Sequence, residues 1–246
     1  DTATAEQKAN LPEGRMAGAA AANSTHAYLM GGIAPGHSFR STVTRIDFSN
    51  DTSAPSPKGP LTAVRAYSSG ASARSNAQYQ FSESILAPVQ PPFPYPEQLP
   101  TPAPAYGYYL SGRENGSPSP ATSKIDRIDF SNDTATTVLK GNMHTGRSGH
   151  SSIGNSTHGY SGGGGNPGPI YLSSIERMTF ANDTETSVDK STFRAAFTQA
   201  PSPGQGANAA VSIGGPAYGY FQGANSTYVD RLDYSNDTAQ AAATTN

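Results

Sequence analysis

The chain has 246 residues, a mass of 25.5 kDa and a formal net charge of −2 from 16 basic and 18 acidic residues. A balance so close to neutral provides no basic field for nucleic acid, and no apolar run approaches the roughly 20 residues of a membrane-spanning helix. The absence of cysteine excludes disulfide bonds, cysteine-ligated zinc and a thiol nucleophile. We therefore expect neither a nucleic-acid partner nor membrane insertion.

The composition is rich in turn-forming residues, with 26 glycines and 20 prolines, and only 14% of the residues are charged. This composition disfavours long amphipathic helices and favours many short strands joined by turns. The length is sufficient for a single domain with its own core. Because the chain starts at Asp1 without an initiator methionine, we expect it to be a processed or excerpted piece of a longer protein.

A seven-residue motif of the form Ile-Asp-Phe-Ser-Asn-Asp-Thr recurs along the chain. Its four copies span residues 46–52, 128–134, 178–184 and 232–238, and they contain Asp51, Asp133, Asp183 and Asp237. The start of the chain, Asp1-Thr-Ala-Thr, matches the four residues from Asp133 and adds a fifth copy of the aspartate position. Successive aspartates are 50, 82, 50 and 54 residues apart. The repeat unit is therefore about 50 residues with one large insertion, which is the size of a four-stranded propeller blade.

Each unit is predicted to contain four strands, and the third unit shows the pattern most clearly. The first strand is predicted over 147–154 and the second over 159–164, where it ends in glycines. The third is predicted over 173–180, where side chains alternate with period two. A tight turn at Asn182-Asp183 then leads to the fourth strand over 184–188.

Several of these features resemble kelch-type β-propeller repeats. An arginine opens the first strand, and an aromatic residue followed by a glycine pair closes the second, as in Tyr28 with Gly31-Gly32 and Tyr160 with Gly163-Gly164. The kelch tryptophan is missing, because the chain contains no tryptophan. The amino-acid sequence of the motif also resembles repeats in virion and tail-associated proteins of aquatic bacteriophages. These resemblances imply an all-β propeller of four kelch-like blades of about 50 residues each and suggest a function only loosely.

We interpret residues 1–246 as a single repeat domain. Residues 1–12 are predicted to form an extra outer strand, and the repeats span about 13–62, 63–144, 145–193 and 194–246. Two separate β-sandwiches are the alternative, since they also contain regular short strands. The recurrence of the same unit favours the propeller, because sandwiches do not require it.

Two repeats carry long insertions between their first and second strands. Residues 77–105 form the larger one, which is rich in proline and contains Phe93, Tyr95 and Leu99. Such a segment is semi-rigid polyproline, either a solvated loop or a contact arm for a neighbouring subunit. As an arm, its three apolar side chains together with Leu11 near the N-terminus would make the assembly contacts.

Eight Asn-x-Ser/Thr sequons lie in or near predicted turns. They are Asn23, Asn50, Asn115, Asn132, Asn155, Asn182, Asn225 and Asn236. Asparagine in these positions is ordinary turn chemistry multiplied by duplication. In a secreted eukaryotic protein, the same residues would be candidate N-glycosylation sites.

No constellation of residues indicates catalysis, a cofactor or a metal. Arginines recur in every repeat, at the first strand and in the third, which favours structural ion pairs over a catalytic group that is needed once. They are Arg15, Arg65, Arg147 and Arg194, and Arg45, Arg127, Arg177 and Arg231. The turn aspartates are expected to cap their turns, since no dense Asp-x-Asp ladder for a cation is present. The five histidines lack a metal-binding spacing.

The sequence therefore predicts a non-enzymatic structural or adhesive repeat protein, a protomer of an extracellular filament or virion appendage. Its partners would be copies of itself, bound through terminal strands and the proline-rich loop. The alternative is a carbohydrate-binding propeller whose partners are surface glycans. The recurring tyrosines of the second strand are expected to be buried between blades, which favours the structural class. They are Tyr28, Tyr108, Tyr160 and Tyr220.

Overall fold

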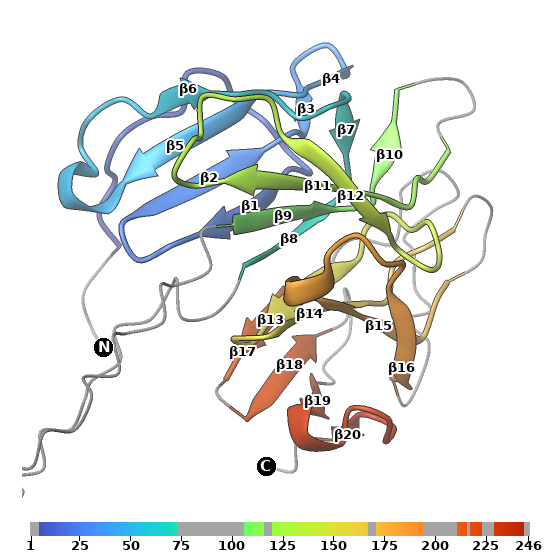
Figure 1. Ribbon diagram of the computed structural model, residues 1–246. Helices are drawn as coiled ribbons and strands as arrows, with labels where there is room; N and C mark the ends of the chain where they lie inside the picture. The colour runs from blue at the N-terminus through green and yellow to red at the C-terminus, as the bar shows by residue number, and fades with distance from the viewer. Residues whose placement is uncertain are drawn as a thin grey trace, which may run out of the picture.

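The structure is a computed structural model that describes residues 5–72, 106–115, 120–166, 171–193, 211–215, 217–222 and 229–243. These residues form short antiparallel strands grouped into four four-stranded sheets, arranged as the blades of a β-propeller (Figure 1). The predicted fold class is confirmed. In the part of the chain that is described, no helix is long and apolar enough to cross a membrane.

Each blade is an antiparallel meander of consecutive strands. Blade 1 contains β1 (Ala19–Ala22), β2 (His26–Met30), β5 (Val43–Asp47) and β6 (Ser56–Lys58). Blade 2 contains β8 (Ser69–Ser72), β9 (Tyr106–Leu110), β11 (Lys124–Asp129) and β12 (Val138–Asn142). Blade 3 contains β13 (Ser151–Gly154), β14 (His158–Gly162), β15 (Ser174–Thr179) and β16 (Val188–Thr192). Blade 4 contains β17 (Val211–Gly214), β18 (Tyr218–Gln222), β19 (Val229–Asp233) and β20 (Ala242–Ala243).

Short elements complete the fold. Two-stranded ribbons are formed by β3 (Ile33–Ala34) with β4 (Ser38–Phe39), and by β7 (Arg65–Ala66) with β10 (Arg113–Glu114). The 3-10 turns η1 (Phe48–Asn50), η3 (Phe180–Asn182) and η4 (Tyr234–Asn236) follow the third strands of blades 1, 3 and 4.

The inner strands β1, β8, β13 and β17 pack against one another in chain order around the centre of the molecule. Small residues allow this approach, because the strands converge there. A Cβ on Gly70 of β8 would lie only 1.9 Å from the carbonyl oxygen of Ala20 in β1. The run of alanine, glycine and serine in these strands is therefore a requirement of the packing.

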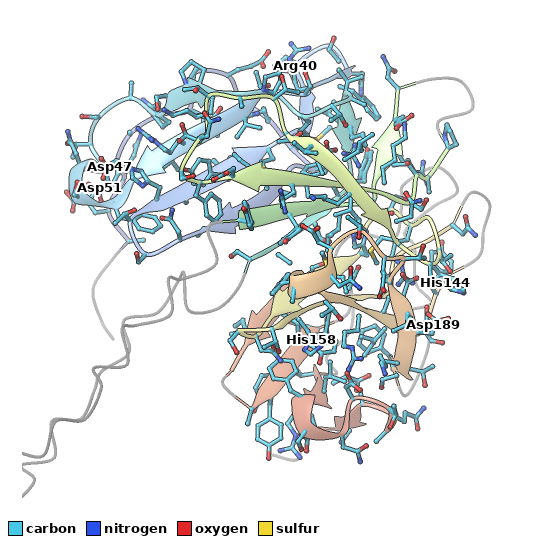
Figure 2. The ribbon with its side chains drawn as sticks, viewed as in Figure 1. Arg40, Asp47, Asp51, His144, His158 and Asp189 are labelled. Atoms are coloured by element: carbon cyan, nitrogen blue, oxygen red, sulfur yellow. The ribbon has the colours of Figure 1, made fainter. Side chains whose placement is uncertain are left out.

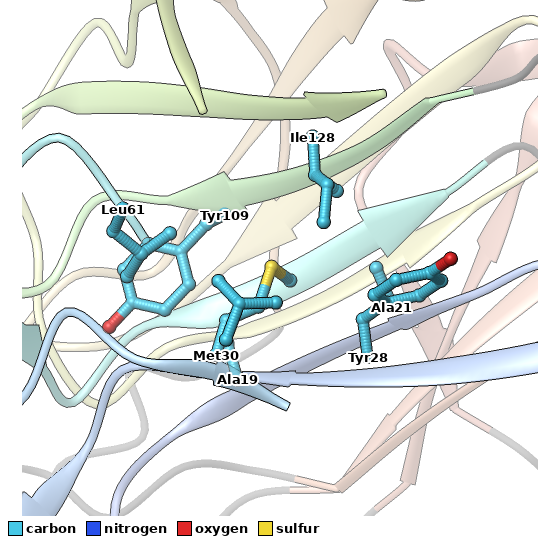
Figure 3. Close-up of a cluster of buried hydrophobic side chains, with 8 residues drawn as sticks. Ala19, Ala21, Tyr28, Met30, Leu61, Tyr109 and Ile128 are labelled. Atoms are coloured by element: carbon cyan, nitrogen blue, oxygen red, sulfur yellow. The ribbon is translucent and has the colours of Figure 1, made fainter. Parts of the chain in front are cut away.

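The hydrophobic core lies between successive blades. Met30 of blade 1 shares one cluster with Leu61, and with Tyr109 and Ile128 of blade 2 (Figure 3). Blade 3 lies between blade 2 and blade 4, so both faces of its sheet are covered. Ile175 and Glu176, neighbours on β15, are therefore both fully buried.

Three of the four recurring tyrosines are core residues, as predicted. Tyr28, Tyr108 and Tyr160 are at most 1% exposed. Each ring stacks on the motif aromatic of the next blade, with centroid separations of 4.8 to 5.2 Å, and the partners are Phe130, Phe180 and Tyr234. Tyr220 in blade 4 is only half-buried, which corrects the prediction for that copy.

The fourth strand of blade 3 starts later than predicted. The sequence pattern places it over 184–188, whereas β16 is Val188–Thr192. The residues before it run along the outer strand of blade 2, where the Gly141 amide donates to the Asp183 carbonyl and the Ser187 amide to the Asn142 carbonyl. The predicted strand is thus displaced because the chain first contacts the preceding blade.

Candidate functional site

The turn aspartate of each motif is the centre of a joint between two blades. Asp133 in blade 2 accepts a hydrogen bond of 3.0 Å from the Tyr28 hydroxyl of blade 1. Its carboxylate also lies 2.9 Å from the Arg45 guanidinium and 3.2 Å from the Lys58 ammonium, both from blade 1. One carboxylate therefore ties three strands of the preceding blade to the next blade.

The same joint is built at the next two blade boundaries. Asp183 is held by Tyr108, Arg127 and Lys140, at 3.1, 2.8 and 3.2 Å. Asp237 is held by Tyr160 at 3.1 Å and by Arg177 at 2.7 Å. We call this arrangement the blade joint. The recurring Arg of the third strand pairs with the next blade, which explains why it recurs.

In the joint between blades 1 and 2, the electrostatics keep Asp133 charged and Tyr28 neutral. Burial by itself would raise the pKa of Asp133, but hydrogen bonds from Tyr28 and Lys58 and the charge of Arg45 outweigh it, so the pKa lies below its usual value. Burial raises the pKa of Tyr28 well above its usual value, and the Asp133 hydrogen bond adds to this effect. The pair is thus a neutral donor and a charged acceptor at neutral pH.

Three turn aspartates, Asp133, Asp183 and Asp237, hold the preceding blade, and for these three the expectation that they cap their own turns is wrong. In blade 1 the turn is capped by Asp47, whose Oδ1 accepts bonds from the Ser49 amide and hydroxyl at 2.9 and 2.7 Å. Asp129 and Asp233 cap the corresponding turns in the same way. The two lysines of the joint, Lys58 and Lys140, are not among the residues identified from the sequence, although a signal exists. Both lie seven residues after a motif aspartate, as Lys8 and Lys190 do.

The joint predicts different roles for equivalent aspartates. Asp183→Ala removes the acceptor of two cations and a buried hydroxyl, so we expect it to lower the free energy of unfolding by about 2 kcal/mol. Asp51→Ala, at the same position in blade 1, should change it by less than about 0.5 kcal/mol, because no described cation pairs with Asp51. Urea unfolding of the dilute proteins measures both. Equal losses at the two positions would contradict the assignment.

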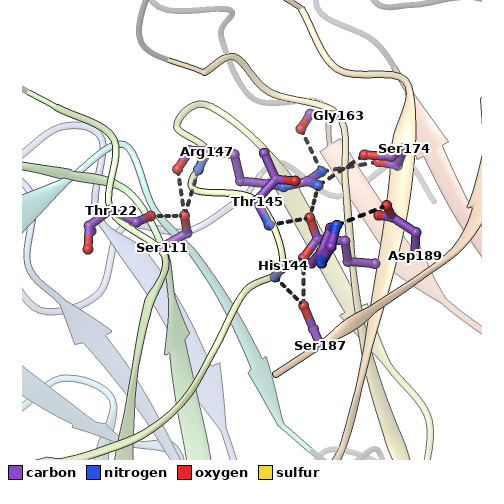
Figure 4. A network of polar contacts seen from close by, with 10 residues as sticks. Ser111, Thr122, His144, Thr145, Arg147, Gly163, Ser174, Ser187 and Asp189 are labelled. Atoms are coloured by element: carbon purple, nitrogen blue, oxygen red, sulfur yellow. Dashed lines mark hydrogen bonds and ion pairs between the residues drawn. The ribbon is translucent and has the colours of Figure 1, made fainter. Parts of the chain in front are cut away.

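The arginine before the first strand forms a second, fully buried pair within its own blade. Arg147 pairs with Glu176, and both side chains are inaccessible to solvent. Figure 4 shows Arg147 in its network of polar contacts, with Gly163 and Ser174. The Arg147 guanidinium also donates to the carbonyls of Gly163 and Ser174, at 3.0 and 3.1 Å. Glu176 in turn accepts from the His144 amide at 2.8 Å. The Arg147 Nε has no hydrogen-bond partner among the described residues, but the rest of the guanidinium and the carboxylate are held by several groups of the fold, which indicates a structural role.

Blade 2 repeats this pair with Arg65 and Asp126, which are also fully buried. Burial lowers the pKa of Arg65, as expected for a cation removed from water. In blade 1 the corresponding Arg15 donates to the hydroxyl of Thr44 at 2.5 Å, because a threonine replaces the acid. Arg194 of blade 4 lies outside the described residues.

His150 is the one histidine that the fold buries completely among those described. Burial, with the nearby charge of Arg147, lowers the pKa of His150 to about 3. The ring is therefore neutral over the whole physiological range and is unsuited to proton transfer near neutral pH.

This buried imidazole predicts a loss of stability in mild acid. The unfolded chain takes up a proton near pH 6.5 and the folded chain only near pH 3, so lowering the pH through this window favours unfolding. Between pH 6 and 5, we expect the free energy of unfolding of the unmodified chain to fall by about 1 kcal/mol per pH unit because of His150. In His150→Leu this part of the decrease should be absent. Urea unfolding at these pH values checks this, with the exposed His37→Asn as control. An unchanged slope in His150→Leu would disprove it.

The other histidines lie at the start of a strand or at the surface. In His26 and His158 the Nδ1 atom lies 2.8 Å from the hydroxyl of the preceding threonine, as duplication of one turn predicts. His144 lies near Asp189, with Nε2 3.7 Å from the carboxylate. Figure 2 labels both residues: Asp189 belongs to β16, and His144 follows β12 in the segment that leads to blade 3. Within the described ranges no cluster of three potential metal ligands occurs.

The candidate modification and assembly residues are placed as follows. The sequon residues Asn50, Asn115, Asn132, Asn182 and Asn236 are exposed, Asn23 and Asn155 are half-buried, and Asn225 lies outside the described residues. In Asn23 and Asn155 the Oδ1 atom accepts bonds from two amides of its own turn. Leu11 is half-buried, and Phe93, Tyr95 and Leu99 lie outside the described residues.

A cavity of about 410 Å³ lies where the inner strands of the four blades meet. Apart from Ile153, the described lining consists of small residues from every blade, and hydroxyls are contributed by Ser72, Ser152 and Ser212. A space of this size suits a small ligand. Among the described residues, the lining contains neither an aromatic platform nor a charged side chain.

Comparison with known proteins supports the fold only. No protein family matches the chain, and no curated protein matches it. The solved structure of YjhT, a propeller-type protein, aligns over 97% of this chain and 67% of its own. The TM-score is 0.63 and the sequence identity is 10%. At that identity the likeness establishes a shared propeller architecture and nothing about activity.

Proposed function

We propose that this chain is a non-enzymatic structural or adhesive repeat protein that acts by presenting surfaces to copies of itself. The blade joint is the observation that carries the proposal. The residues that recur in the repeats, and that would be the first candidates for chemistry, are engaged in holding blades together. Asp133, Asp183 and Asp237 bind the preceding blade, and Arg65 and Arg147 are buried in ion pairs.

The setting follows from the sequence resemblances. Two resemblances support an extracellular filament or a virion appendage. One is the kelch-like pattern, and the other is the resemblance of the motif sequence to repeats in virion and tail-associated proteins of aquatic bacteriophages. The exposed sequon asparagines suit a surface location, where glycans would be tolerated in a eukaryotic host.

The proposal is tested by assembly of the purified chain. We expect multimers by light scattering and regular particles or filaments by electron microscopy. Deleting residues 87–104 tests the proline-rich arm, and deleting residues 1–10 tests the terminal segment, with circular dichroism to show that blades remain folded. A chain that stays monomeric at all accessible concentrations would overturn the proposal.

A carbohydrate-binding propeller remains the second candidate, because of the cavity at the centre of the blades. Its serine hydroxyls would offer hydrogen bonds to a neutral sugar. The recurring tyrosines cannot act as stacking platforms in three blades, since Tyr28, Tyr108 and Tyr160 are buried. A glycan array decides this point: specific binding that Ser152→Val abolishes would support the lectin, and an empty array would remove it.

A further inference from the structure

Blade 2 contains a tyrosine in a backbone conformation that favours glycine. Tyr67 has a φ of 56°, in the left-handed region, where the Cβ atom of a side chain crowds the carbonyl oxygen that follows. It lies between β7 and β8, two residues before the inner strand of its blade. The inner strand of blade 2 packs between those of blades 1 and 3, so Tyr67 has a neighbouring blade on each side.

The same conformation recurs at the equivalent residues of these neighbours. Ala17 and Gly149 have φ values of 57° and 65°, and each also lies two residues before an inner strand. Backbone hydrogen bonds join the three residues. The Tyr67 amide donates to the Ala17 carbonyl and the Gly149 amide to the Tyr67 carbonyl, each at 2.8 Å. The fold therefore requires this conformation, but alanine and glycine meet the requirement in the other blades, so a tyrosine is not needed for it.

The Tyr67 side chain contributes little to the fold that would offset this strain. The residue is only half-buried, and its hydroxyl has no hydrogen-bond partner among the described residues. The recurring tyrosines differ in both respects, since Tyr108, for example, is buried and donates to Asp183. Strained residues that the packing does not explain cluster at sites where ligands bind.

Arg113 places a cation beside the Tyr67 ring. The central carbon of its guanidinium lies 5.9 Å from the centre of the ring. Its Nε donates to the Ser148 hydroxyl at 3.0 Å, whereas its two terminal nitrogens have no acceptor among the described residues. The neighbouring acid, Glu114, pairs with Lys124 at 2.7 Å. Arg113 thus keeps a positive charge and two donor nitrogens available for an anion.

The fold holds Arg113 in place before any ligand arrives. Its backbone pairs with Ala66 in the β7–β10 ribbon, which Figure 1 shows, and with Ala121 in an isolated bridge. The bond from Nε ends on Ser148, which is only 1% exposed and is therefore a fixed acceptor. A cation positioned in this way loses less conformational entropy when it binds an anion.

We propose that Tyr67 and Arg113 form a binding site for a small organic carboxylate. The two terminal nitrogens of the guanidinium match the two oxygens of a carboxylate, which arginine binds through paired hydrogen bonds. The Tyr67 ring provides an apolar surface for the body of the ligand, and its hydroxyl provides a further hydrogen bond. The site goes beyond the proposed function, because it takes a small molecule and not a copy of this chain. It is also separate from the central cavity, whose described lining includes neither residue.

Benzoate is the probe that tests this proposal, because it joins a carboxylate to a ring, and benzamide is its uncharged counterpart. In a saturation-transfer NMR titration we expect the chain to bind benzoate with a dissociation constant of roughly 1 mM, as suits a ligand of this size. Benzamide should bind about tenfold more weakly or not at all, because it lacks the charge. Arg113→Met keeps the stem of the side chain and removes the charge, so it should weaken benzoate binding by about tenfold or more.

Tyr67→Gly separates binding from folding, because glycine occupies the same position in blade 3 and relieves the strain. It should weaken benzoate binding while the melting temperature stays the same or rises. Arg40→Met is the matched control, since it removes an arginine that already pairs with Glu13, and it should bind benzoate as the unmodified chain does.

Three results would overturn the proposal. Benzoate and benzamide could bind equally well or not at all, which would remove the role of the carboxylate. Arg113→Met or Tyr67→Gly could bind benzoate as the unmodified chain does, which would place the ligand elsewhere. Tyr67→Gly could also melt well below the unmodified chain, which would assign the tyrosine to the fold.

Discussion

Arg147→Ala should be among the most destabilising substitutions in this protein. It leaves the carboxylate of Glu176 buried without its cation, and it removes the donors to the carbonyls of Gly163 and Ser174. Breaking such a buried pair from one side typically costs about 3–5 kcal/mol. Urea unfolding followed by circular dichroism measures the loss.

Two controls distinguish the buried pair from a simple count of charges. Arg40→Ala breaks the partly exposed pair with Glu13, whose atoms lie 2.6 Å apart, and should have little effect because water replaces the lost contact. The double variant Arg147→Met with Glu176→Leu should recover most of the loss, since no buried charge remains. A double variant as unstable as Arg147→Ala would contradict the role assigned to the charge.

Tyr160→Ala should produce a loss of similar size. The ring is 1% exposed, stacks on Tyr234 at 5.2 Å and donates to Asp237. Truncating a buried aromatic leaves a cavity and costs about 3–5 kcal/mol, which would lower the melting temperature by several degrees. Differential scanning calorimetry provides the measurement.

The matched control is Tyr220→Ala, at the same position in blade 4. Tyr220 is only half-buried and has no following blade to stack on among the described residues, so its loss in the dilute protein should be clearly smaller. Tyr160→Phe separates the two contributions of the side chain, because it keeps the stack and removes only the hydrogen bond to Asp237. Equal losses for Tyr160→Ala and Tyr220→Ala would contradict a joint that needs a following blade.

The sequence predicts the blades well because their strands repeat. A period of about 50 residues, the glycines after Tyr28 and Tyr160 and the motif at the end of each third strand suffice to place four meanders. The sequence does not show that Asp183 binds the preceding blade, because a repeat reveals what recurs and not which neighbouring copy it touches. The late start of β16 has the same origin, since residues before it first follow blade 2.

In the terminal blades, too, the sequence does not show which neighbouring blade a repeated residue contacts. Tyr220 is predicted to be buried because its equivalents are, yet burial of this position depends on a blade that follows. Phe48 likewise has the motif context of Phe130 and Phe180 but no described tyrosine to stack on. Composition and period are the same for inner and outer copies, so only the three-dimensional arrangement shows which halves of the joint are left open.

The central claim, that one aspartate joins two blades, can be measured by a double-mutant cycle at Arg127 of blade 2 and Asp183 of blade 3, whose charged atoms lie 2.8 Å apart. Urea unfolding of Arg127→Ala, Asp183→Ala and the double variant gives the three losses of stability. We expect the double variant to lose about 1 kcal/mol less than the sum of the two single losses, because both substitutions remove the same contact. Losses that simply add would contradict the account.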